Sequence, residues 1–238
     1  IRDAQESRGL GDVYKRQLGY YYFDIGLLLR ETNIINAILF NSEVWFALTE
    51  KHITSLENID LLYLRKLLNA HSKTALEAFY IEMGLMPIKF IIKCRRLMYW
   101  WHIQKSGDSS LIHKVYKAQK IDPVKNDWIL QVEKDKKEYS IDMNDEEISR
   151  VSKALFKKKV KKGAREKTIN YLKNLKDKHS KLDNISVGYK FKPQEYFTDT
   201  KLNPTEVKLL FKLRTRMYNC KDNFKKLHED NIWCELCK

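Results

Sequence analysis

Apolar residues recur every three or four positions along most of this chain, the spacing that places them on one face of an α-helix. Between Tyr20 and Phe40 this period leaves almost no polar face, which predicts a buried helix. Further helices are expected after Thr49, which is placed as a cap, and from Pro87 to about Lys105. The chain has only 8 Gly and 4 Pro, too few for the many turns of an all-β fold. The sequence therefore predicts an all-α fold, built as a multi-helix bundle.

Short motifs indicate where individual helices begin and end. Thr74–Glu77 and Asn144–Glu147 have the pattern of capping boxes, in which two side chains satisfy the free amides of a helix start. Gly84 suits a left-handed helix stop. Asn203 and Pro204 are placed to cap and open the last helix. These motifs predict separate helices joined by short connections.

The charge balance indicates an anionic partner. The formal net charge is +14 and the pI is near 9.4, which favours nucleic acid first and an anionic membrane surface second. No apolar run reaches the ~18 residues of a transmembrane helix, so no membrane span is expected. The 4 cysteines are too few and too irregularly spaced for a secreted disulfide framework. We therefore expect the nucleus and/or the cytoplasm as the location.

Composition shifts along the chain predict five consecutive segments. The first, Ile1–Gln17, is polar and aperiodic and resembles a non-native leader, a disordered native terminus being the alternative. Residues 183–202 lack the apolar spacing of a helix and contain Gly188 and Pro193, which predicts a linker there. The expected segments are the leader (1–17), a helical bundle (18–122), a basic helical region (123–182), a linker (183–202) and a C-terminal helix with a cysteine pair (203–238).

A first candidate phosphate-binding stripe lies on the helix after Pro87. Lys89, Lys93, Arg96 and Trp100 follow one another at spacings of four, three and four residues, so they share one face. Cations beside an indole suit a nucleic-acid backbone, with the ring available to a sugar or base. An ordinary solvated helix face is an equally good interpretation.

The most basic part of the chain is residues 150–181, which contains thirteen Lys and Arg opposed by Glu166 and Asp177. A helical apolar stripe runs beneath the charge, so we expect an amphipathic helix pair with a hinge near Gly163. A solvated charge run and a membrane-surface helix are the alternatives, and the apolar face is sparse for the latter. The residues expected to bind phosphate here are Lys157, Lys158, Lys161, Lys162 and Arg165.

The C-terminal cysteines suggest metal binding. Cys234 and Cys237 form a CxxC, which is half of a tetrahedral zinc site. We expect a partial zinc site whose other ligands are not in the chain. A closed site with Cys220 and His228, or two unpaired structural thiols, are the alternatives.

Catalytic motifs are not found in the sequence. It has no Gly-rich phosphate loop, no nucleophile elbow and no Asp-Asp pair. No catalytic residue is therefore assigned.

A series of short stretches, in matching order, resembles the region downstream of the polymerase palm in the reverse transcriptase of non-LTR (LINE-type, jockey-like) retrotransposons. The resemblance covers about residue 20 to the end. The stretches are Tyr22–Arg30, Asn41–Trp45, Leu64–Leu68, Ala70–Thr74, Gly84–Ile92, Arg95–Leu97, Pro123–Trp128, Leu213–Met217 and Cys234–Cys237.

This resemblance implies a helical, polymerase thumb-like bundle, followed by a basic helical arm and a truncated zinc knuckle. The parent protein would be an RNA-directed DNA polymerase whose Mg²⁺ is held by the missing palm. This fragment would bind the hybrid of RNA template and DNA primer and act with the palm and fingers of the same polypeptide, and it is expected to be inactive alone. The chain departs from the family in lacking the palm and the downstream knuckle ligands, and in having Cys220 at a usually apolar position. The alternative is a stand-alone basic helical scaffold that binds acidic protein partners.

Overall fold

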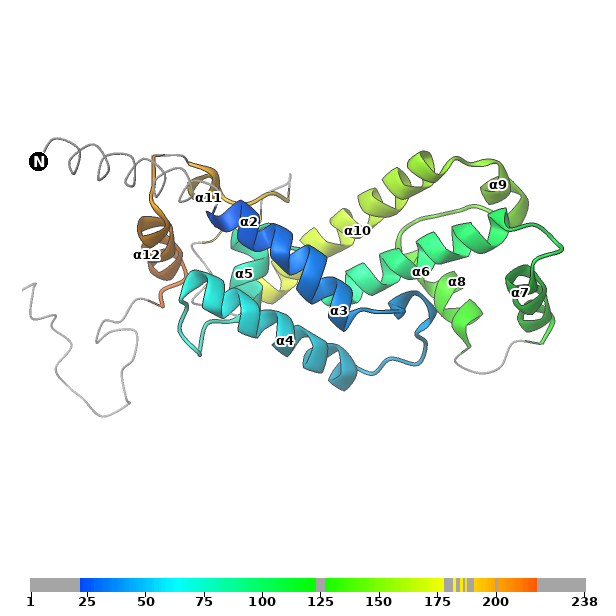
Figure 1. Ribbon diagram of the computed structural model, residues 1–238, viewed down its shortest axis with the longest axis horizontal. Coiled ribbons are helices and arrows are strands. Elements are labelled where there is room, and N and C mark those ends of the chain that lie inside the picture. The colour runs from blue at the N-terminus through cyan, green and yellow to red at the C-terminus, as the bar shows by residue number, and fades with distance from the viewer. Residues whose placement is uncertain are drawn as a thin grey trace, which may run out of the picture. The chain divides into compact units, whose positions relative to one another are not determined.

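The computed structural model describes residues 22–122, 127–177, 182, 185, 187, 191–199 and 201–217. Over these residues the chain is helical and contains no strand, which confirms the all-α prediction (Figure 1). No helix in the described ranges is long and apolar enough to cross a membrane. The elements are α2 (Tyr22–Leu29), the π-helical η1 (Arg30–Ile35), α3 (Asn36–Ile38), the 3₁₀ turn η2 (Ser42–Val44), α4 (Glu50–Leu68), α5 (Leu76–Glu82), α6 (Ile88–Lys105), α7 (Leu111–Ile121), α8 (Trp128–Glu138), α9 (Asp145–Arg150), α10 (Lys153–Lys176), α11 (Glu195–Thr198) and α12 (Pro204–Arg214).

Contacts group these helices into two compact units that are discontinuous in sequence. Unit 1 takes its residues from Ile1–Asn33, Asp60–Leu85 and Leu172–Lys238. Unit 2 is formed by Ile34–Ile59 and Met86–Tyr171. Helices α4 and α10 therefore contribute residues to both units, and the grouping differs from the consecutive segments expected from composition.

Helix α6 forms the centre of unit 2 and contacts η2, α7, α8 and α9. Its Trp100 is fully buried and meets Phe156 of α10 with the two ring centroids 6.0 Å apart. Val132 of α8 and Ile148 of α9 complete this core from two further helices. Because other helices pack around α6, several of its polar side chains face the protein interior and not solvent.

Helix α10 is one uninterrupted helix, so the predicted hinge near Gly163 is wrong. Gly163 is buried inside it, and a Cβ added there would lie 2.7 Å from both Cβ and the carbonyl oxygen of Tyr139. The missing side chain allows close packing against Tyr139 and does not serve a bend.

Unit 1 is held by aromatic pairs and buried ion pairs. Phe79 of α5 packs on Phe211 of α12 with centroids 5.0 Å apart. Arg30 and Asp60, both almost fully buried, form two hydrogen bonds of 2.6 and 2.7 Å. The buried Glu82 of α5 joins two further elements through hydrogen bonds to Arg214 of α12 and Tyr196 of α11; its carboxylate accepts from Nε of Arg214 at 2.8 Å and from the Tyr196 hydroxyl at 2.6 Å.

The helix-end predictions are confirmed where the motif is local and exposed. Asn144 and Asn203 each form a complete capping box, and Thr49 Oγ1 accepts from the amide of His52. The capping box expected at Thr74 is wrong, because α5 begins at Leu76 without a side-chain cap. Thr74 is instead buried, and its hydroxyl has no hydrogen-bond partner among the described residues. The side chain of Thr74 packs into the interior and therefore does not cap α5.

Two other segments differ from their predictions. The segment from Tyr20 to Phe40, expected as one buried helix, is helical without a break from Tyr22 to Ile38, with the π-helical η1 between α2 and α3. It is not buried all round, because Ile25, Leu28 and Leu29 are exposed. The expected linker contains α11, whose Phe197 is buried and meets Phe23 edge-on at 5.4 Å. The spacing of apolar residues does not show which faces of a helix are covered by other helices.

Candidate nucleic-acid interface

The basic side of α10 is an exposed, structurally anchored surface. Phe156, Val160, Ala164 and Thr168 recur every four residues and are buried, which fixes the helix to unit 2. On the remaining surface, Glu166 is the sole acidic residue of the helix. The basic face of α10 is defined here as Lys157, Lys158, Lys161, Lys162 and Arg165, all of which are exposed.

Geometry brings these five cations together. Lys157, Lys161 and Arg165 follow at intervals of four residues, and Lys158 and Lys162 lie alongside them. The row from 157 to 165 spans about 12 Å at the rise of an α-helix. Within the described part of the chain, none of the five forms an ion pair. Their charges are therefore available to a partner.

The predicted stripe on α6 is used differently. Arg96 is 4% exposed and Trp100 is 0% exposed, so these two side chains are core residues, and the expectation of an exposed stripe is corrected. Arg96 donates to Asp135 Oδ2 at 2.6 Å and to the carbonyl of Trp45 at 2.9 Å. The indole N–H of Trp100 donates to the Tyr116 hydroxyl at 3.3 Å. The physical reason is that α6 is covered by neighbours on this face.

Lys89 and Lys93, at the start of the same stripe, are partly buried and already have partners. The ammonium of Lys89 lies 3.2 Å from the ring centroid of Tyr171, and burial lowers its pKa. The ammonium of Lys93 lies 2.5 Å from Glu138 Oε2. Both cations are therefore less available than those of α10.

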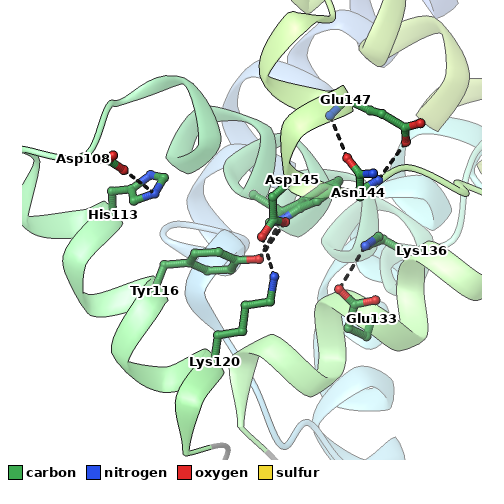
Figure 2. A network of polar contacts seen from close by, with 10 residues as sticks. Asp108, His113, Tyr116, Lys120, Glu133, Lys136, Asn144, Asp145 and Glu147 are labelled. Atoms are coloured by element: carbon green, nitrogen blue, oxygen red, sulfur yellow. Dashed lines mark hydrogen bonds and ion pairs between the residues drawn. The ribbon is translucent and has the colours of Figure 1, made fainter.

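A polar network joins α7 to the start of α9, and sequence reasoning missed it. Figure 2 shows the Tyr116 hydroxyl and the Lys120 ammonium turned toward the carboxylate of Asp145. Their distances to its oxygens are 3.1 and 2.6 Å. Burial raises the pKa of Tyr116 far above its usual range, so the phenol stays protonated and donates. The capping box at Asn144 was the one local signal that marked this position.

A cavity of about 670 Å³ lies beside this network. Its lysines are paired internally, because Lys117 lies 2.7 Å from Asp108 and Lys120 lies 2.6 Å from Asp145. The hydrogen bond from Lys117 lowers the pKa of Asp108, which keeps the carboxylate charged. The cavity thus lacks the one-sided positive charge of the basic face of α10.

The predicted metal ligands Cys234 and Cys237, like Cys220 and His228, lie outside the described residues. Within the described ranges, no group of three or more His, Cys, Asp or Glu could hold a metal ion. The partial zinc site therefore stays a prediction.

Cys94 of α6 is expected to react slowly with alkylating reagents. Burial raises the pKa of its thiol to about 12, outweighing a hydrogen bond with Tyr139. Only the thiolate is nucleophilic, so at pH 8 we expect labelling by iodoacetamide about a thousandfold slower than for an ordinary thiol. Peptide mass spectrometry of timed samples, with urea-unfolded chain as the control, measures this rate. Equal rates in the folded and unfolded chain would contradict the prediction.

Comparison with protein-family models, with curated proteins and with solved structures finds no match for this chain.

Proposed function

We propose that this chain binds double-stranded nucleic acid through the basic face of α10, as the thumb-like part of a non-LTR retrotransposon reverse transcriptase. The observation that carries the proposal is that Lys157, Lys158, Lys161, Lys162 and Arg165 are exposed and form no ion pair with any described residue, on a helix whose opposite side is anchored in the core. A rigid row of cations suits the regular negative charge of a duplex.

The same surface favours backbone binding over sequence reading. The basic face consists of Lys and Arg side chains alone, and contacts to phosphate position a protein on nucleic acid without selecting a sequence. A polymerase thumb has this requirement, because it must hold a template–primer hybrid of any sequence. The resemblance of the sequence to the reverse-transcriptase family supports this hybrid as the ligand.

In this proposal the chemistry belongs to the palm of the parent enzyme, where carboxylates would hold Mg²⁺ for nucleotidyl transfer. This chain would supply binding and position, and it is expected to be inactive alone. Cys234 and Cys237 would contribute thiolates to a zinc site, which two ligands by themselves hold weakly. Its partners would be the hybrid and the palm and fingers of the same polypeptide.

The test is a triple neutralisation, Lys157→Gln, Lys161→Gln and Arg165→Gln. Removing three phosphate contacts is expected to lower the slope of log affinity against log salt by about 3, and to weaken binding at least tenfold. Fluorescence anisotropy with a 20-bp RNA–DNA hybrid between 50 and 200 mM NaCl measures both quantities.

The matched control neutralises Lys51, Lys114 and Lys134, which are exposed lysines of unit 2 on other helices. It removes the same net charge and should change the salt slope little. If the two triple variants lost equal affinity for the hybrid, binding would depend on overall charge, and this would contradict binding through the basic face of α10. If polyglutamate displaced the hybrid at equal charge concentration, the alternative of a scaffold for acidic proteins would replace the proposal.

A further inference from the structure

A second concave site lies on unit 2, beside the start of α10. It is a pocket of about 400 Å³ whose walls combine three aromatic rings with charged side chains. Tyr99, Trp101 and His102 come from α6, and Lys153 is the first residue of α10. None of the sequence motifs identified above accounts for this combination.

The rings are held in place without a ligand. The indole N–H of Trp101 donates to the carbonyl of Val151 at 3.1 Å. Tyr99 meets Trp128 edge-on at 5.8 Å and stacks on His102 with centroids 6.2 Å apart and an interplanar angle of 28°. Aromatic surfaces that are already ordered lose little conformational entropy when a flat ligand stacks on them.

The polar groups around the rings divide into fixed and available ones. Arg95 is fixed by its hydrogen bonds to the carbonyl of Leu39 at 2.6 Å and to Asn36 Oδ1 at 2.7 Å. The ammonium of Lys153, the ring nitrogens of His102 and the carboxylate of Glu43 form no hydrogen bond or ion pair within the described part of the chain. The pocket thus offers the ammonium of Lys153 for a phosphate and the carboxylate of Glu43 as an acceptor for a base amino group.

We infer that this pocket takes one unstacked nucleobase of a single-stranded segment, with its phosphate at Lys153. Stacking of a base on aromatic side chains beside a cation is the physical basis of single-strand binding. The carboxylate of Glu43 would accept from an exocyclic amino group. This inference rests on the proposed function, and it adds a single-stranded ligand to the duplex ligand of α10.

Position along α10 links the two sites. Lys153 lies one helical turn, about 6 Å, before Lys157 at the edge of the basic face. A strand that leaves a duplex bound along the basic face would therefore meet the pocket within about one nucleotide. The expected ligand is a hybrid with a single-stranded overhang.

The experiment compares a blunt 12-bp RNA–DNA hybrid with the same hybrid carrying a four-nucleotide overhang, by anisotropy on the full chain. The overhang is expected to tighten binding by about tenfold, within the range of one stacked base. Trp101→Leu should abolish this advantage and leave the affinity for the blunt hybrid unchanged. The triple variant of the basic face should weaken both ligands equally.

Two outcomes would overturn the inference: equal binding of the two hybrids by the unaltered chain, or an overhang advantage that survives in Trp101→Leu. Because Trp101 also packs against the core of unit 2, the double variant His102→Ala/Lys153→Gln, in which both residues are exposed, provides an independent test if Trp101→Leu fails to fold. Failure of the blunt hybrid to bind would contradict the proposed function of α10. An eight-nucleotide single strand would then still test the pocket.

Discussion

Replacing Arg96 by alanine is expected to lower the free energy of unfolding by about 3–5 kcal/mol, the usual cost of breaking a buried ion pair. The variant leaves the Asp135 carboxylate, 2% exposed, without its cation. It also removes the hydrogen bond to the carbonyl of Trp45. Urea unfolding followed by far-UV circular dichroism measures the change.

A neighbouring residue provides the matched control. Arg95→Ala removes a guanidinium of the same size, but its partners are a carbonyl and an amide oxygen and not a carboxylate. We expect its cost to be about 1–2 kcal/mol. A double variant, Arg96→Met with Asp135→Leu, should recover most of the loss because no buried charge remains. A loss from Arg96→Ala no larger than that from Arg95→Ala would contradict the core role of Arg96.

The same variant should show a defined pH dependence. Burial raises the pKa of Asp135, and Arg96 opposes that rise, so removing Arg96 raises the pKa further. A carboxyl with a raised pKa in the folded chain takes up its proton there first, and lowering the pH therefore favours folding. The loss of unfolding free energy caused by Arg96→Ala should be largest at pH 8. It should shrink as the pH falls through the raised pKa of Asp135.

Gly84→Ala is expected to destabilise the chain by about 2–4 kcal/mol, from a left-handed backbone and a steric clash together. Gly84 has φ +61°, and a Cβ there would lie 2.5 Å from the carbonyl carbon of Lys192. The contact is between two backbone segments, so no side chain can move aside. The amide of Gln194 also donates to the carbonyl of Glu82 at 2.9 Å, which fixes this approach.

Gly107→Ala separates the two contributions, since Gly107 has φ +76° and its added Cβ would have no atom of the described residues within 4 Å. It should cost about 1 kcal/mol, the backbone part alone. The difference between the two variants measures the packing of the segment around Lys192 against the end of α5. Equal costs would mean that this segment is a free linker, as composition alone suggested.

Local interactions explain what was predictable. The capping boxes at Asn144 and Asn203 need residues only three positions apart, and Gly84 needs only its own backbone angle. The amphipathic character of α10 is likewise a property of one continuous segment. These features, and with them the basic face of α10, follow from spacing and residue type.

Residues whose role depends on distant neighbours could not be predicted in this way. Arg96 and Asp135 are 39 positions apart, and the pairing leaves no periodic signal. Gly163 was expected to mark a hinge because glycine weakens an isolated helix, whereas Tyr139 packs against it. The aromatic pocket at Tyr99 combines α6 with the start of α10, a juxtaposition that neither segment encodes alone.

The all-helical class, the helix starts at Thr49, Asn144 and Asn203, and the basic residues of α10 could be predicted from the amino-acid order, because hydrogen bonding and side-chain period act over a few residues. The burial of Arg96, Trp100 and Phe197 and the unbroken course of α10 depend on contacts between helices that are distant in the sequence. An arginine or tryptophan side chain can be exposed to solvent or buried in the interior. It is buried where another helix supplies a hydrogen-bond or ion-pair partner that offsets the cost of removing it from water.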